Sequence, residues 1–153
     1  FLDTIRSYPE IKGKTFAFLG DNSFSSILLL FILAYQKKTI VLLNPLEDEK
    51  LRKEKLNSLP FDGRVKGNQR IPYPNPKEND NKEAYFYFYT SGTTSSSKAV
   101  VLTEENLCAS SYNGSYCLPL TEQDRFLSLL PLFHVLCLVC ALLWSRQCHS
   151  TIC

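Results

Sequence analysis

Apolar and polar positions divide the N-terminal part of the chain into apolar segments separated by short polar turns. Residues 14–19 and 39–43 are short apolar runs, whereas residues 24–36 are apolar around most of the circumference of a helix. The short runs predict buried strands, and the longer one predicts a helix that packs on a sheet and is capped within residues 21–23. Strand, helix and strand in this order are typical of a parallel sheet with a right-handed crossover.

The following segment is polar and rich in charge. Residues 47–59 predict an amphipathic helix whose sparse apolar side consists of Leu46, Leu51, Leu56 and Leu59. We interpret its charge run as a solvated face with ion pairs between residues four positions apart, and a phosphate or partner site there is the alternative. Residues 63–82, with several Pro, Asn and Lys residues, predict an exposed loop.

Beyond that loop, apolar runs again predict strands that alternate with helices. The pattern predicts, in order, a strand at 85–89, a strand at 100–102, a helix at 104–112 capped by Thr103, a strand at 125–130, a helix at 135–146 and a strand at 150–153. The run 111–116 is expected to end the first of these helices. We therefore assign the chain to the α/β class, with a mostly parallel sheet flanked by helices.

The segment between the first two of these strands carries the main candidate chemistry. Residues 91–97 are all Ser, Thr or Gly, and Lys98 follows them directly. Because such a loop has little side-chain bulk, its backbone N–H groups can surround an anion, and the hydroxyls and the lysine add donors suited to phosphate. We interpret it as a polyphosphate-binding loop. A Ser/Thr-rich surface turn or flexible linker is the alternative with the same composition.

The spacing of this loop argues against a Walker-type phosphate loop. That motif has Gly immediately before its lysine and Ser or Thr immediately after it. Here Ser97 precedes Lys98 and Ala99 follows it, although Gly92 stands at the expected first position. A Walker-type kinase or GTPase is therefore not expected.

Segment 89–107 instead resembles the signature loop of the adenylate-forming superfamily, which includes acyl-CoA synthetases, aryl-CoA ligases, luciferases and peptide-synthetase adenylation domains. The family pattern is Tyr/Phe-Thr-Ser-Gly-Thr/Ser-Thr-Gly-x-Pro-Lys-Gly-Val, followed by a Thr-His-x-Asn-like helix start. The chain matches this pattern at Thr90, Ser91, Gly92, Thr93, Thr94, Lys98, Val100, Thr103 and Asn106. It departs from the pattern at Ser95, Ser97, Ala99 and Glu104.

Two other segments resemble the same superfamily. The turn 20–23 and the triplet Leu-Asn-Pro at 43–45 resemble its opening strand–helix–strand unit, and the resemblance implies a structural role for them. Segment 124–134 resembles its Leu-Pro-x-Phe-His element, which implies that Phe133 and His134 line the acid side of the site. On its residues alone, a hydrogen-bonded histidine at a helix start is the favoured interpretation of His134, and its place after Lys98 in the family's order reverses that preference.

The resemblance implies the N-terminal part of an ATP-dependent, AMP-forming carboxylate–CoA ligase. Such an enzyme converts an acid and ATP to an acyl-adenylate and pyrophosphate, and then transfers the acyl group to coenzyme A. The resemblance implies a catalytic role for His134 and phosphate binding by Thr90, Ser91, Gly92, Thr93, Thr94, Ser95, Ser96, Ser97 and Lys98. It also implies ATP, Mg²⁺ and coenzyme A as cofactors, and a small-molecule carboxylic acid and the remainder of the ligase chain as partners. No metal ligand is assigned within this chain. The alternative is a truncated or degenerate non-catalytic homologue that acts as a structural or partner-binding domain.

We expect residues 1–153 to form a single partial domain, the N-terminal part of an adenylate-forming enzyme. Its parts are the opening unit at 1–62, an exposed loop at 63–83, and a part at 84–153 that carries the phosphate loop and His134. The chain contains no methionine and opens on Phe1, so we interpret it as a piece of a longer polypeptide or a processed product.

Composition and charge narrow the classes of partner. The 153 residues are 44% hydrophobic and 21% charged, which is ordinary for a globular protein. A formal net charge of +2 is too small to argue for nucleic acid or a membrane surface. The apolar run 27–35 is shorter than the roughly 20 residues that a membrane span needs, and no signal peptide is visible. We therefore expect a cytoplasmic protein without a membrane span.

The six cysteines lie toward the C-terminal end of the chain. Cys137 and Cys140, with the pair Cys148 and His149, have a spacing from which a zinc site can be drawn. The favoured interpretation is that Cys137 and Cys140 belong to an apolar helix, in which cysteine behaves as a small hydrophobic residue.

Overall fold

Parallel strands form the centre of the protein. The computed structural model describes residues 1–59, 61–66, 69–72, 78–90 and 98–153, and only the backbone of residues 69–72. Its main sheet contains six strands in the order β4-β3-β1-β2-β5-β6. These strands are β1 (Thr15–Leu19), β2 (Thr39–Leu42), β3 (Gly63–Lys66), β4 (Gln69–Pro72), β5 (Tyr85–Tyr89) and β6 (Ala99–Thr103). Strands β3, β1, β2 and β5 run parallel, and β4 and β6 are antiparallel strands at the two edges.

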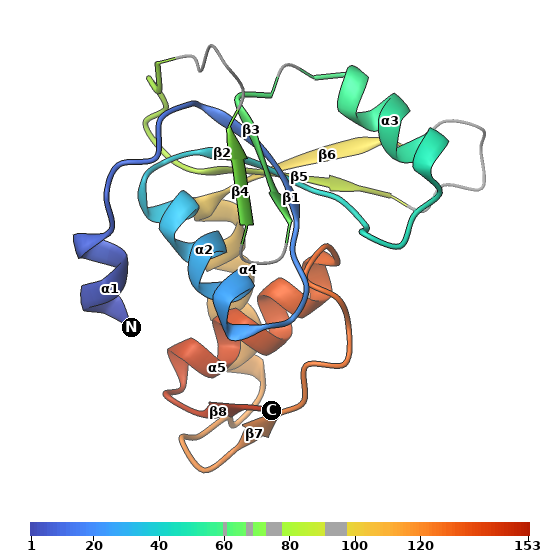
Figure 1. Cartoon of the computed structure of the whole chain (residues 1–153). Coiled ribbons are helices and arrows are strands. Elements are labelled where there is room, and N and C mark those ends of the chain that lie inside the picture. Colours follow the sequence, from blue (N-terminus) through green and yellow to red (C-terminus); the bar gives the residue numbers. More distant parts are fainter. Residues whose placement is uncertain (60, 67–68, 73–77, 91–97) are drawn as a thin grey trace.

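Helices cover both faces of this sheet (Figure 1). The helices are α1 (Leu2–Ser7), α2 (Phe24–Tyr35), α3 (Glu49–Asn57), α4 (Glu104–Cys117) and a C-terminal helix whose parts are η1 (Cys137–Leu143) and α5 (Trp144–Gln147). In Figure 1, α2, α4 and α5 lie below the sheet, and α3 lies on its opposite side. The short strands β7 (Arg125–Phe126) and β8 (Thr151–Ile152) pair in parallel as a separate small sheet. The α/β class and the mostly parallel sheet are therefore confirmed.

The alternation of side chains along the strands explains why both faces are covered. Phe16 and Phe18 of β1 belong to the core that α2, α4 and η1 share. Ala17 and Leu19 belong to the smaller core under α3. Because successive strand residues point to opposite faces, a strand with no polar position between Phe16 and Leu19 must be covered on both sides.

Segment 63–82 differs from the predicted loop. Gly63–Lys66 (β3) pairs in parallel with β1, and Gln69–Pro72 (β4) pairs antiparallel with β3 as an edge strand. The loop prediction was wrong here because proline marked the segment as non-strand. An edge strand tolerates proline, since one side of such a strand has no partner for the missing N–H group.

Helix α4 is longer than predicted, and Gly114 explains the error. The run 111–116, which contains Gly114, was predicted to end this helix, but α4 continues through it to Cys117. A Cβ atom at Gly114 would lie 2.3 Å from the ring of Trp144 on α5. Glycine at this position therefore allows two helices to approach closely and does not end α4. The predicted capping of α4 by Thr103 is confirmed, because the Thr103 and Asn106 side chains form a reciprocal capping box.

Gly114→Ala is expected to destabilise the fold. Alanine gains about 1 kcal/mol of helix propensity over glycine, but overpacking against a ring costs about 1–3 kcal/mol. We expect a net loss of roughly 1 kcal/mol in the free energy of unfolding, measured by urea denaturation. Asn113→Ala on the exposed side of the same helix is the matched control and is expected to be neutral or slightly stabilising. A Gly114→Ala chain as stable as the Asn113→Ala chain would contradict the packing role.

The segment between β7 and the C-terminal helix is mostly irregular. The predicted strand at 125–130 is regular only at Arg125–Phe126. The predicted helix at 135–146 is confirmed, although its central turns are wider than an α-helix, with the Trp144 N–H donating to the Val139 carbonyl. Across the described parts of the chain, the helices are too short or too polar to span a bilayer.

Candidate functional site

Two of the predicted site residues, Thr90 and His134, line one cleft at the carboxyl ends of the parallel strands. The carboxyl ends of β2 and β5 open into a cleft of about 700 Å³. Its wall includes Asn44 after β2, Lys55 of α3, Tyr89 and Thr90 at the end of β5, and Phe133 and His134 before η1. Ligands of open α/β sheets bind outside the carboxyl ends of the strands. The cleft therefore has the position expected of a binding site.

The two ends of the hydroxyl-rich loop are joined at this edge. The backbone N–H of Thr90 donates to the Lys98 carbonyl at 3.0 Å, and the Thr90 hydroxyl lies 3.4 Å from the same oxygen. These contacts extend the antiparallel pairing of β5 and β6, in which Tyr89 faces Ala99. The loop is thus closed at its base, with Thr90 and an exposed Lys98 beside each other in the backbone.

The inner part of the loop cannot be assigned from the structure. Ser91, Gly92, Thr93, Thr94, Ser95, Ser96 and Ser97 lie outside the described residues. Of the predicted phosphate ligands, only Thr90 and Lys98 are therefore placed. The interpretation of residues 91–97 as a phosphate-binding loop remains a prediction.

His134 also lines the cleft and stands at the start of the C-terminal helix. Its N–H donates to the Pro131 carbonyl at 3.0 Å, and its own carbonyl accepts from Cys137 N at 3.0 Å and from Leu138 N at 3.3 Å. The imidazole is exposed and lies against the Phe133 ring, with 4.5 Å between the ring centroids. The backbone of His134 is thus fixed by the turn and the helix, while its ring stays accessible to a ligand in the cleft.

The structure adds a charged pair to the site that the sequence interpretation missed. Lys55 is 9% exposed, forms an ion pair with Glu47, and holds its ammonium 4.6 Å from the centre of the Tyr89 ring. The Glu47 Oε2 atom is buried and has no hydrogen-bond partner among the described residues. Lys55 and its partner therefore anchor the strand end that leads into Thr90.

The prediction of a fully solvated charge run on α3 was wrong at this pair. The available signal was spacing, since Leu51 and Lys55 lie four residues apart on one face of α3 and Leu59 follows at the same interval just beyond its end. Leu46, which was assigned to that apolar side, is 91% exposed. The predicted ion pairing four residues apart is confirmed at Glu49 and Lys53, at 2.8 Å.

Cys137 and Cys140 both lie in the apolar C-terminal helix, as predicted. Within the described residues, no group of three or more His, Cys, Asp or Glu side chains is arranged to hold a metal ion. Cys137 is buried in the main core. Burial, and to a lesser extent the neighbouring Cys137, raises the pKa of the Cys140 thiol.

Comparisons with known proteins place this chain in a family. A family model described as AMP-binding enzyme matches residues 15–153. Crotonobetaine/carnitine–CoA ligase of Citrobacter koseri is 40% identical over 62 residues, which cover 40% of this chain and 12% of that ligase. The 2-succinylbenzoate–CoA ligase of Bacillus cereus is 44% identical over 54 residues, which cover 35% of this chain and 11% of that ligase.

Solved structures agree with these matches. The o-succinylbenzoate CoA synthetase of Bacillus subtilis, in complex with its acyl-adenylate intermediate, superposes with a TM-score of 0.74 and 26% identity. The match covers 94% of this chain and 43% of the synthetase chain. Apo MatB of Rhodopseudomonas palustris, at 14% identity and a TM-score of 0.73, shares the fold over 98% of this chain and 36% of its own.

This chain spans less than half the length of each of these relatives. The family model nevertheless matches all of it except the residues before Thr15. The chain therefore belongs to the AMP-binding enzyme family, and it corresponds to an N-terminal portion of an adenylate-forming enzyme.

Proposed function

We propose that this chain supplies the phosphate-binding part of an ATP-dependent, AMP-forming carboxylate–CoA ligase. The observation that carries the proposal is the cleft, which brings Thr90 and His134 together at the carboxyl edge of parallel strands. Lys98 is joined to Thr90 at the base of the loop that opens at this edge. Backbone amides, hydroxyls and one ammonium at such an edge suit the phosphates of a nucleotide.

In the proposed reaction, a carboxylate oxygen attacks the α-phosphorus of ATP, the bond to the β-phosphate oxygen breaks, and pyrophosphate leaves. Lys98 and the loop would bind the departing phosphates, so that their negative charge is stabilised as the bond breaks. His134, which lines the same cleft as Thr90, would hold the carboxylate in line with the phosphorus. Acyl transfer to coenzyme A, the carboxylic acid partner and the remainder of a longer ligase chain belong to the same proposal.

The residues present fit a nucleotide better than they fit a metal ion on its own. Mg²⁺ is usually held by one or two carboxylates together with the phosphates of a substrate. We therefore assign no residue of this chain to Mg²⁺ and expect it to arrive with ATP. The Bacillus subtilis synthetase has been solved with ATP and a magnesium ion, and with AMP. Because the synthetase is related to this chain, its ligands support the proposed binding of ATP and Mg²⁺. The cytoplasmic location expected from the sequence remains a prediction.

Titration calorimetry of the chain with MgATP tests the proposal. We expect saturable binding that inorganic pyrophosphate competes away, because the loop is proposed to bind the phosphate tail. Adenosine is the control ligand and is expected not to compete. Absence of saturable binding for both MgATP and pyrophosphate would contradict the phosphate-binding role and favour the alternative of a non-catalytic homologue.

A further inference from the structure

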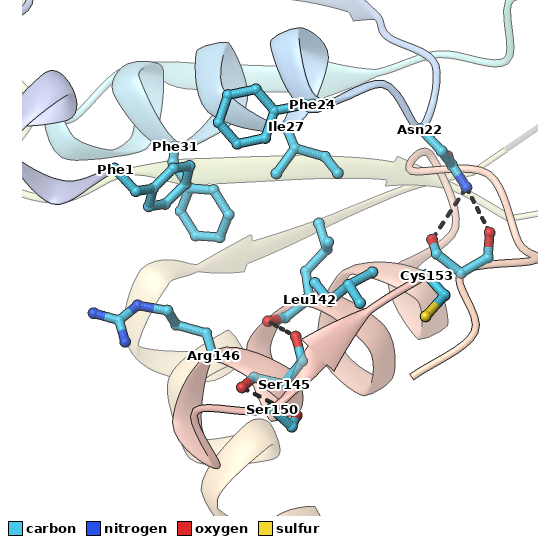
Figure 2. A pocket seen from close by; sticks show the side chains of 12 residues that line it. Phe1, Asn22, Phe24, Ile27, Phe31, Leu142, Ser145, Arg146, Ser150 and Cys153 are labelled. Carbon is cyan, nitrogen blue, oxygen red and sulfur yellow. Dashed lines mark hydrogen bonds between the residues drawn. The ribbon is translucent and has the colours of Figure 1, made fainter. Parts of the chain in front are cut away.

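One side chain ties the turn before α2 to the irregular segment that leads to His134. The Asn22 Nδ2 atom lies 2.8 Å from the Leu130 carbonyl, 3.0 Å from the Ser128 carbonyl and 3.2 Å from the Ser128 hydroxyl. The Asn22 Oδ1 atom accepts from the Leu132 N–H at 3.1 Å. Figure 2 shows Asn22 at the rim of a hollow beside α2, with two of these contacts drawn as dashed lines. A single amide thus bonds three residues that lie more than 100 positions away in the chain.

These bonds matter because the segment has little regular pairing of its own. Residues 127–134 lie outside the helices and strands. Ser128 N donates to the Cys153 carbonyl at 2.9 Å, and Leu129 N donates to the Leu127 carbonyl at 3.1 Å. The Leu130 carbonyl and the Leu132 N–H are both bonded by Asn22. The Asn22 side chain therefore satisfies two backbone groups, just before Phe133 and His134, that a neighbouring strand would otherwise bond.

The position of Leu132 carries the constraint on to His134. Leu132 is fully buried, at 0% exposed, and its N–H donates to the Asn22 Oδ1 atom. His134 is two residues further on, and its N–H is bonded to the Pro131 carbonyl in the same turn. Since Asn22 fixes the backbone on both sides of Pro131, it also fixes where the imidazole enters the cleft.

Asparagine suits this position better than its neighbours in the turn. The site needs a donor for two carbonyls and an acceptor for one N–H, and a primary amide offers both on one planar group. Asp21 accepts from Ser23 and Ser26, and Ser23 caps α2, so both are used within their own turn. An aspartate in place of Asn22 would keep the acceptor but turn a carboxylate oxygen toward two carbonyls.

We propose that Asn22 is a positioning residue that sets the place of the His134 ring in the cleft. The functional meaning of that place rests on the role proposed for His134 above, but the coupling between the two residues is a property of the fold. Because Asn22 is an exposed polar residue, its loss is expected to displace the segment without unfolding the chain.

Nuclear magnetic resonance of histidine side chains tests this coupling directly. The chain has only His134 and His149, so selective ¹³C,¹⁵N-histidine labelling gives two sets of ring signals. We expect Asn22→Asp to move the His134 signals several-fold more than the His149 signals. Ser23→Ala is the matched control, because it weakens the cap of α2 in the same turn without touching residues 128–132. It is expected to lower thermal stability while leaving the His134 signals in place.

Asn22→Ala is the second variant, and it removes the bonds without adding charge. It is expected to move the same signals in a chain that unfolds cooperatively. Unmoved His134 signals in Asn22→Ala, or a Ser23→Ala chain that moves them equally, would overturn the inference. A separate MgATP titration distinguishes failure of the proposed function from failure of the positioning role of Asn22. If the wild-type chain binds no MgATP while Asn22→Ala still moves His134, the proposed function fails and the positioning role stands.

Discussion

Lys98→Ala is expected to weaken MgATP binding by roughly ten- to a hundredfold while leaving the fold intact. A hydrogen bond to a charged group contributes about 1.5–3 kcal/mol, which corresponds to that range of affinity. Lys98 is exposed, and its backbone carbonyl rather than its side chain accepts from Thr90. The substitution therefore removes a cation from the mouth of the loop without removing the contact that closes the base.

Lys82→Ala is the matched control for this prediction. Lys82 is also exposed and precedes β5, so it lies at the end of that strand remote from Thr90. Both substitutions lower the net charge by one. Only Lys98→Ala should weaken MgATP binding by more than this change in net charge does. Equal affinities of the two variants, measured by titration calorimetry, would remove Lys98 from the proposed phosphate site.

Leu132→Ala is expected to cost about 2–5 kcal/mol in the free energy of unfolding. Leu132 is 0% exposed and belongs to the main core, although it stands in an irregular segment. Its truncation would leave a cavity next to the turn that carries His134. Against a typical total stability of about 5–15 kcal/mol, this loss is large enough to show clearly in urea denaturation.

A leucine three positions earlier provides the comparison. Leu129 lies in the same segment but is 77% exposed, so Leu129→Ala is expected to change stability by less than about 0.5 kcal/mol. If the two alanine variants were equally stable, the segment would not be anchored through Leu132, and the placement of His134 would need another support.

The strands and helices of this chain were predictable wherever apolar periodicity was strong. The strand, helix and strand of residues 14–43 are found as β1, α2 and β2, because their apolar runs supply much of the buried core. The strands that flank the hydroxyl-rich loop are likewise found, at β5 and β6. Resemblance to the adenylate-forming superfamily then identified the family without any structural information.

The errors arose where a local signal had a tertiary cause. Gly114 looks like a helix end in sequence, but it is small because Trp144 packs on it from another helix. Lys55 looks like part of a solvated face, but an ion pair and an aromatic ring allow its burial. Asn22 looks like a capping residue, whereas its partners lie more than 100 positions later. Only Lys55 left a periodic signal, its spacing from Leu51 and Leu59, whereas the contacts of Gly114 and Asn22 leave none in the sequence.

Strand β6 has one consequence for the handling of this protein. It ends the main sheet within the described residues, and Val100 and Val101 on it are 42% and 46% exposed. Natural sheets usually protect such a border with a lysine or a proline, and residues 99–103 contain neither. Two molecules that meet along this border can continue each other's hydrogen-bond ladder, so concentrated solutions of the chain are expected to self-associate there.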